Sequence, residues 1–250
     1  TEVYLAGKRN GSDAQFNRCI NSGGWTCTDL LNNNKDNSNQ DLEDVWGDSS
    51  NVYFLGKRGR LFIFDHTLSG NADPANAANW TEETACKDLA ADSDFKDLWG
   101  DGAGNVYLTG KGKSSGNQAT VWKYDGSTCS VMYETTTQDK MDGGIYGSTA
   151  TGEIYAGGKA GLIIFSTDNG ATWNEKTEGT QDIKDVWASS AGNAYYAGKG
   201  GETTVCTTDS EATVTTVATG GSAISADTSP AGTGAYTTLT GPVIDESNEG

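Results

Sequence analysis

The sequence is poor in the residues on which most catalytic sites depend. Its 250 residues include one histidine, His66, and four arginines, the last of which is Arg60. A single histidine excludes a zinc site with several histidine ligands. A Ser-His-Asp triad would have to use His66, which we expect at an exposed strand end. Four arginines are too few for a cluster that converges on a substrate carboxylate from several parts of the fold.

Long apolar runs, proline and positive charge are also scarce. The longest apolar runs, residues 61–64 and 162–165, have the length of a strand, whereas a membrane helix needs about 18 residues. The chain has only 3 prolines, so its composition is not that of a low-complexity linker. Its formal net charge of −17, with no basic stripe, repels a phosphate backbone. We therefore expect neither a membrane span nor nucleic-acid binding.

Motifs for nucleotide or hydrolytic chemistry are missing or weak. No Gly-x-Gly-x-x-Gly opens a helix after a strand, and no Walker-type loop occurs. A glycosidase needs two carboxylates about 5 to 9.5 Å apart. Glu82, Glu83, Glu134 and Glu153 are candidates, but a chain with 34 acidic residues offers such pairs by chance. We predict no catalytic residue and expect that the chain is not an enzyme.

The five cysteines are an odd number, so at least one is free or pairs with another molecule. Cys19 and Cys27 flank an Asn-Ser-Gly-Gly turn and could form a disulfide across a short hairpin if their Cα atoms lie within about 6 Å. Such a bond implies an oxidising compartment. Cys86, Cys129 and Cys206 are left unassigned. No signal peptide precedes the first strand pattern, so an exported protein would be present here in a mature or trimmed form.

The chain does contain an internal repeat. The phrase Tyr-x-x-Gly-Lys begins at Tyr4, Tyr53, Tyr107, Tyr155 and Tyr195, and a weaker copy begins at residue 236. The intervals of 40 to 54 residues are close to the length of one four-stranded propeller blade.

A second phrase precedes four of these copies, with a turn of Asp, Ser, Gly and Asn between the two. Such a pair is typical of a β-hairpin. Further strands are expected over residues 60–65, 120–124 and 162–165, and a fourth strand begins near Trp25, Trp80 or Trp173, or at Cys129. The copies of the second phrase are Asp44-Val45-Trp46-Gly47, Asp97-Leu98-Trp99-Gly100, Ile145-Tyr146-Gly147 and Asp185-Val186-Trp187-Ala188.

Adjacent apolar residues such as Val45 and Trp46 indicate inner strands that are buried on both faces. One repeat cannot cover both of its own faces, so the array must close into a ring or expose its ends. We predict an all-β chain that forms a single β-propeller over residues 1–250. Six blades are favoured, with five and seven as alternatives, and a C-terminal strand could complete the N-terminal blade. The expected blade-like repeats are residues 2–42, 43–95, 96–140, 141–183, 184–222 and 223–250.

These repeats resemble those of bacterial secreted and surface β-propellers and of photosystem II assembly-factor-like propellers. Residues 166–173, Ser-Thr-Asp-Asn-Gly-Ala-Thr-Trp, are similar to an Asp-box, the turn of the BNR repeat. The resemblance implies that Asp168 accepts backbone hydrogen bonds within a hairpin turn and that Trp173 packs between blades. It implies similar packing roles for Trp46, Trp99, Tyr146 and Trp187. It indicates a fold and leaves the function open.

Asp-boxes also occur in sialidase-like propellers, but the missing arginines argue against that activity. Asp36, Asn39 and Asp41 lie in an oxygen-rich stretch that offers a weak calcium candidate. The stretch lacks the spacing and the glycine of an EF-hand, so a polar loop is the preferred interpretation. No cofactor is otherwise predicted.

The repeat also predicts a pattern of charge on one face of the ring. Each lysine of the Tyr-x-x-Gly-Lys phrase should lie near the start of the preceding inner strand, which would place Lys57, Lys111 and Lys199 close to Asp44, Asp97 and Asp185 respectively. The pattern is either a set of surface ion pairs, each worth about 0 to 1 kcal/mol, or a rim that docks a partner. The predicted rim residues are Lys57, Lys111, Lys159, Lys199, Asp44, Asp97 and Asp185.

We expect a non-catalytic binding or scaffold module that is secreted, periplasmic or at the cell surface. Its partner would be a protein or a polysaccharide. Self-assembly through unpaired strands is an expected variant. The alternative is a carbohydrate-active enzyme or lectin of the Asp-box propeller type.

Overall fold

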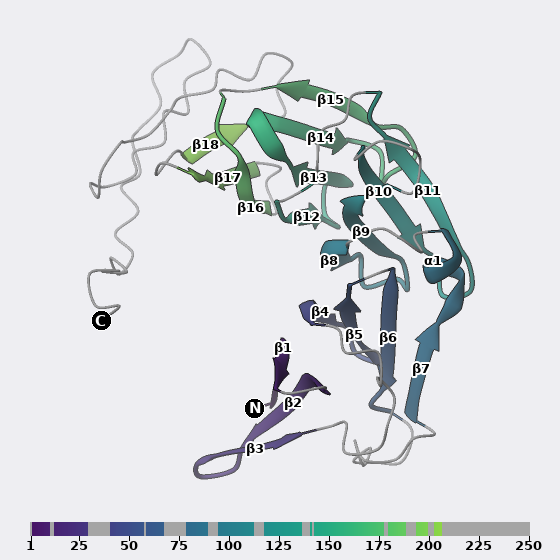
Figure 1. Cartoon of the computed structure of the whole chain (residues 1–250), viewed down its shortest axis with the longest axis vertical. Helices are drawn as coiled ribbons and strands as arrows, with labels where there is room; N and C mark the ends of the chain where they lie inside the picture. Colours follow the sequence, from purple (N-terminus) through teal and green to yellow (C-terminus); the bar gives the residue numbers. More distant parts are fainter. Residues whose placement is uncertain are drawn as a thin grey trace.

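The computed structural model describes residues 2–10, 13–29, 41–57, 59–67, 79–89, 95–112, 118–136, 141, 143–177, 180–188, 194–199 and 203–206. These residues form five antiparallel β-sheets that follow one another along the chain. The sheets stand side by side around an arc, and one edge strand of each faces the inside of the arc (Figure 1). The prediction of an all-β chain of antiparallel sheets is confirmed, with four strands in three of the sheets and three described strands in the first and the fifth.

The first sheet contains β1 (Glu2–Asn10), β2 (Asp13–Asn21) and β3 (Trp25–Asp29). The second contains β4 (Leu42–Gly47), β5 (Asn51–Gly56), β6 (Arg60–Asp65) and β7 (Trp80–Glu83), and α1 (Thr84–Leu89) follows it. The third contains β8 (Phe95–Gly100), β9 (Val106–Lys111), β10 (Ala119–Tyr124) and β11 (Cys129–Glu134). The fourth contains β12 (Ile145–Ser148), β13 (Glu153–Gly157), β14 (Leu162–Ser166) and β15 (Asn174–Thr177), with a 3-10 turn at Lys159–Gly161. The fifth contains β16 (Ile183–Ala188), β17 (Ala194–Gly198) and β18 (Thr203–Cys206).

The two repeated phrases form the two inner strands of each sheet. The second phrase lies on β4, β8, β12 and β16, and the Tyr-x-x-Gly-Lys phrase lies on or starts in the strand that follows. Trp46 pairs with Tyr53 across β4 and β5, and the same register places Trp99 opposite Tyr107 and Trp187 opposite Tyr195. In the first sheet the tyrosine phrase lies on β1, and no described strand of that sheet corresponds to β4.

The apolar core lies between successive sheets. Val45 packs with Phe16 and Phe54 in the cluster between the first and second sheets, whereas Trp46 packs in the cluster between the second and third. The adjacent apolar residues of the inner strands therefore serve opposite faces, as the sequence predicts. Full burial of a side chain such as Phe54 contributes about 1.5 to 3 kcal/mol to the free energy of unfolding, and the partly buried Val45 contributes less.

The turn between β14 and β15 is held by Asp168. Its Oδ1 atom accepts the backbone N–H of Thr172 at 2.8 Å, and Asn169 and Gly170 adopt positive φ angles of 58° and 77°. Trp173 donates its indole N–H to the Gly170 carbonyl at 3.0 Å, and its ring lies 6.1 Å from that of Tyr107 in the third sheet. These contacts match the structural roles expected for Asp168 and Trp173.

Two disulfides join parts of the sheets. Cys19 and Cys27 face each other across β2 and β3, which confirms the predicted bond, with their Cα atoms 4.0 Å apart. Cys86 of α1 pairs with Cys129 at the start of β11, a bond that the sequence analysis left open. Among the described residues, no helix is long and apolar enough to cross a membrane.

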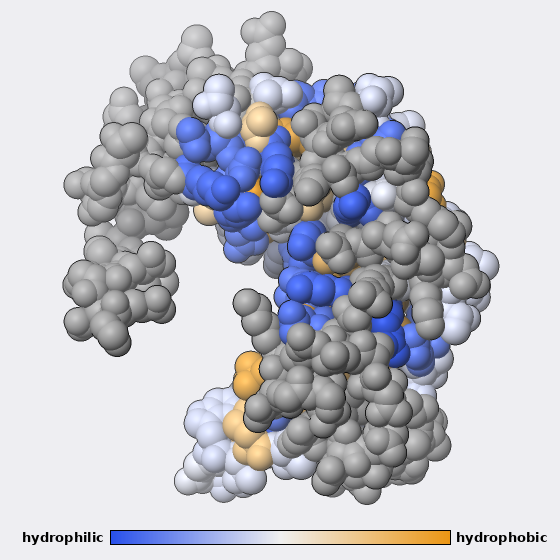
Figure 2. Space-filling view, in the orientation of Figure 1, coloured by the Kyte–Doolittle hydropathy of each residue, from blue (hydrophilic) through white to orange (hydrophobic). Residues whose placement is uncertain are grey.

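The hydropathy of the surface differs between the inside of the arc and the first sheet. Hydrophilic side chains follow the inner strands, while apolar surface is visible at the first sheet (Figure 2). There Val3 and Leu5 of β1 are 38% and 47% exposed, and Trp25 of β3 is 55% exposed. Their face of the sheet points away from the second sheet, because Tyr4 and Ala6 on the opposite face pack against it.

Candidate functional site

The aspartate of the inner-strand phrase connects one sheet to the next. Asp44 of β4 accepts the backbone N–H of Leu98 in β8 at 3.1 Å. Asp97 of β8 accepts the N–H of Ile145, the first residue of β12, at 2.6 Å. We call each of these contacts an inter-sheet bond. It satisfies a backbone donor at the inner edge of the following sheet.

The tryptophan two residues later makes a second contact with the same neighbouring sheet. A Cβ atom added to Gly100 would lie 2.2 Å from the Trp46 indole, and one added to Gly147 would lie 2.6 Å from the Trp99 indole. Each glycine of the phrase therefore provides the space for the ring from the preceding sheet. The aspartate, tryptophan and glycine of the phrase thus form one set of inter-sheet contacts, which is repeated between successive sheets.

The fourth sheet departs from this pattern. Gly144 occupies the position of the aspartate, and the place of its missing Cβ is approached by Asp97 Oδ2 and Asp185 Oδ1, at 2.7 and 2.6 Å. Asp185 Oδ1 accepts the N–H of the next residue in its own strand, Val186, at 2.8 Å. The inter-sheet bond is thus replaced here by a bond within β16.

A β-bulge precedes each aspartate. The strand register shifts between Leu42 and Asp44, between Phe95 and Asp97, and between Ile183 and Asp185. The extra residues are Glu43, Lys96 and Lys184, all of them charged. Because bulges re-aim side chains, they present these three charges separately from the carboxylates that follow.

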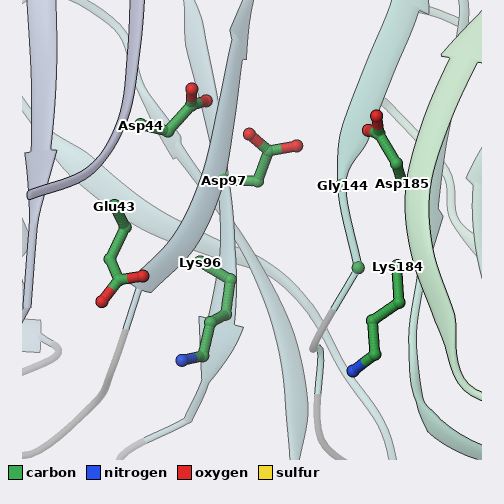
Figure 3. A pocket seen from close by; sticks show the side chains of 8 residues that line it. Glu43, Asp44, Lys96, Asp97, Gly144, Lys184 and Asp185 are labelled. Atoms are coloured by element: carbon green, nitrogen blue, oxygen red, sulfur yellow. The ribbon is translucent and has the colours of Figure 1, made fainter. Parts of the chain in front are cut away.

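These residues line a cavity of about 460 Å³ on the inside of the arc, which we call the charged pocket. Asp44, Asp97 and Asp185 extend to one side of it, and the bulged residues extend to the other (Figure 3). The lining residues are Glu43, Asp44, Lys96, Asp97, Gly143, Gly144, Lys184 and Asp185.

Asp97 is the most perturbed acid of this pocket. Burial raises the pKa of its carboxyl well above the ordinary value, and a hydrogen bond with Asp44 together with the negative charge of Asp44 raises it further. The backbone N–H groups of Ile145 and Leu98 lower the pKa and only partly offset these effects. Asp44 raises the pKa of Asp97 both as a hydrogen-bond partner and as a charge, so we treat the two residues as a pair.

The predicted lysine rim is arranged differently from the expected pairs. Lys57 contacts Asp41 at 3.1 Å and Glu43 at 3.3 Å, and Lys199 contacts Asp182 at 2.8 Å. Asp41 and Asp182 each lie three residues before the aspartate that was expected to be the partner. Lys111 ends β9, and Lys159 begins the 3-10 turn before β14. Whether this rim binds a partner stays a prediction.

Sequence reasoning missed Lys96 and Lys184 as pocket residues. The signal that could have found them is their position directly before the aspartate of the repeated phrase, where Glu43 stands in the second sheet. Lys96 and Lys184 reach the pocket because each is the extra residue of a β-bulge. The residues of the repeated phrase do not indicate that a bulge is present.

The calcium candidate falls largely outside the described residues, which include Asp41 but neither Asp36 nor Asn39. Within the described ranges, no group of three or more His, Cys, Asp and Glu side chains is arranged to hold a metal ion. His66 is half-buried, and its Nε2 atom lies 3.3 Å from the Asp48 carbonyl. It was expected to be exposed, and the adjacent turn after β4 covers it.

No family model and no curated protein matches the chain. Among solved structures, it is similar to the crystal structure of Raptor from Chaetomium thermophilum, with 12% sequence identity and a TM-score of 0.53. The match covers 82% of this chain and 20% of the Raptor chain. At this level of identity the similarity concerns the fold alone.

Proposed function

We propose that the chain is a β-propeller whose described sheets are blades, and that it acts as a non-catalytic binding module outside the cytoplasm. Its charged pocket would contact a protein or polysaccharide partner. A ring of stacked sheets is supported by the inner strands, which pack against neighbours on both faces. It is also supported by the repeated inter-sheet contacts of Asp44, Trp46 and Gly100. The two disulfides support an oxidising compartment.

The observation that carries this proposal is that the residues of the charged pocket have two different roles. Asp44 and Asp97 are engaged by backbone N–H groups of the next sheet, so these carboxylates stabilise the fold. The bulged Glu43, Lys96 and Lys184 line the same pocket, where Glu43 contacts Lys57 at 3.3 Å and Lys184 contacts Asp182 at 3.7 Å. Repeated charges on rigid strands are well placed for recognition, because the strands fix their spacing.

Charge reversal at the bulges tests the proposal. We expect the double variant Lys96→Glu/Lys184→Glu to lose at least tenfold in retention on immobilised cell-surface proteins and polysaccharides of the source cells. Lys176→Glu on the outer strand β15 should bind like the unmodified chain. Equal retention of the pocket variant and the unmodified chain would contradict the proposal.

One observation favours the second candidate, a carbohydrate-active enzyme. The raised pKa of Asp97 suits the general acid of a glycosidase, although its hydrogen-bonded neighbour Asp44 lies closer than the second carboxylate of such an enzyme. Release of reducing ends from polysaccharides by the unmodified chain, abolished in Asp97→Asn, would establish this activity. We expect no release from either chain.

A further inference from the structure

A second cavity lies at the opposite ends of the inner strands from the charged pocket. It has a volume of about 400 Å³ and follows four successive sheets from Trp46 to Ala188. We call it the aromatic groove, and its size lies within the range of small-ligand sites. Its lining residues are Trp46, Trp99, Gly100, Asp101, Gly102, Tyr146, Gly147, Ser148, Thr149, Ala150 and Ala188.

The walls of the groove are flat rings held in fixed positions. The Trp46 and Trp99 indoles each lie against a glycine of the following sheet. The Trp99 and Tyr146 ring centroids are 6.2 Å apart, and the Tyr146 ring is partly exposed. Rings fixed in this way offer apolar area at little cost in conformational entropy.

Ser148 supplies a polar group without a partner. Its side chain is only 6% exposed, and within the described residues its Oγ atom has no hydrogen-bond partner. Ser148 lines the aromatic groove and also an adjoining cavity of about 180 Å³ next to Trp99 and Tyr107. A buried hydroxyl without a partner is costly, so this group points to a ligand that bonds to it.

The remaining polar groups define the chemistry of that ligand. Among the described residues that line the groove, none is lysine or arginine, so a phosphate or carboxylate would find no counter-charge. Asp101 offers a carboxylate, of which one oxygen accepts the N–H groups of Ala103 and Asn105 and the other accepts the Asn105 side chain. Hydroxyl and carboxylate oxygens beside flat aromatic faces suit a ligand with many hydroxyls and exposed C–H groups.

We propose that the aromatic groove binds a pyranose ring of a neutral polysaccharide. The C–H face of the sugar stacks on the Tyr146 ring, and sugar hydroxyls bond to Ser148 Oγ and to Asp101. This site is separate from the charged pocket and does not require that pocket to bind a partner. It goes beyond the proposed function by naming a ligand class and a location.

The test uses the full chain in native gels that contain laminarin, xyloglucan, galactomannan or dextran. We expect at least one of the four to retard the chain. The variant Ser148→Ala should bind about three- to tenfold more weakly, because it loses one neutral hydrogen bond. Its thermal midpoint should be unchanged or higher, because the variant removes a buried group without a partner. Ser130→Ala, an exposed serine on β11, is the matched control.

A second pair of variants tests the aromatic wall. Tyr146→Ala should abolish the retardation, whereas Trp25→Ala, which removes an exposed ring on the first sheet, should leave it intact. The charge-reversal variant of Lys96 and Lys184 should also bind the polysaccharide normally, which separates this inference from the proposed function. Absence of retardation by all four polysaccharides, or equal retardation of Ser148→Ala and the unmodified chain, would overturn the inference.

Discussion

Asp97 shows how a single side chain can stabilise the fold at one pH and weaken it at another. Its pKa is raised in the folded chain, so the protonated carboxyl contributes stability below the ordinary aspartate pKa. That contribution is lost as the pH rises through the raised pKa. Above the raised pKa, the negative charge of Asp44 repels the ionised Asp97 carboxyl.

The variant Asp97→Asn should raise the free energy of unfolding at pH 7 by on the order of 1 kcal/mol. An asparagine keeps an oxygen for the Ile145 N–H and offers an N–H to Asp44, as the protonated acid does. Urea unfolding between pH 3 and pH 8 should show a flatter pH dependence for the variant. A loss of stability at pH 7 would contradict the raised pKa of Asp97.

Gly100 is expected to tolerate no side chain. A Cβ atom there would lie 2.2 Å from the Trp46 indole, so Gly100→Ala should lower the free energy of unfolding by about 1 to 3 kcal/mol. Gly24→Ala is the control, because a Cβ at Gly24 has no atom within 4 Å. Equal stability of the two variants by urea titration would contradict the inter-sheet packing of Trp46.

For single residues, the sequence predicts which of them lie on inner strands but not which neighbours they contact. Asp44 and Trp46 belong to a repeated phrase, and repetition alone places them in equivalent positions. Their contacts with Leu98 and Gly100 depend on how two sheets stack, which involves residues more than fifty positions apart.

The bounds of the strands were more predictable from the sequence than the register in which neighbouring strands pair. The strand expected over residues 60–65 matches β6, and Trp80 and Cys129 begin β7 and β11 as expected. Glycine-rich turns and apolar runs determine these bounds locally. The lysine partners were not predictable in the same way, because the bulge at Glu43 places Asp41, in place of Leu42, opposite Lys57.

The disulfide between Cys86 and Cys129 should be the more stabilising of the two. It ties α1 to β11 and joins residues 43 positions apart, whereas Cys19 and Cys27 are 8 positions apart. In the chain-entropy model its loss costs about 4 kcal/mol, against about 2.5 kcal/mol for the shorter loop. Urea unfolding of the Cys86→Ser/Cys129→Ser and Cys19→Ser/Cys27→Ser variants should show this order, and the reverse order would contradict it.

For the whole molecule, the succession of sheets was predictable because each of the five complete copies of the repeat lies in a sheet of its own. The weaker copy at residue 236 and the expected repeat over residues 223–250 lie outside the described residues. The number of blades was not, because it depends on what covers the two ends of the described array. Trp187 of the fifth sheet takes the position of Trp46 and Trp99, whose rings pack against a glycine of the next sheet. Trp187 is 52% exposed, and the described residues include no glycine of a next sheet against which its ring packs.

The proposed ring predicts that Trp187 is covered in the full chain. Trp187→Ala should then lower the free energy of unfolding by an amount close to that of Trp99→Ala, about 3 to 5 kcal/mol. Urea titration of both variants measures the difference. A loss below about 1 kcal/mol for Trp187→Ala would mean that this face stays open, and would favour self-assembly through it.

Gly144 changes how two neighbouring sheets are joined. The fourth and fifth sheets lack the aspartate bond at this place and are held instead nearer the 3-10 turn, where Ile183 donates its N–H to the Gly158 carbonyl and Ala160 donates its N–H to Asp182 Oδ1. The amide of Val186, which donates to Asp185 of its own strand, should exchange with deuterium faster than those of Leu98 and Ile145, which donate to an aspartate of the preceding sheet. Equal protection of the three amides would show that the bonds near the 3-10 turn protect this junction as well as the aspartates protect the others.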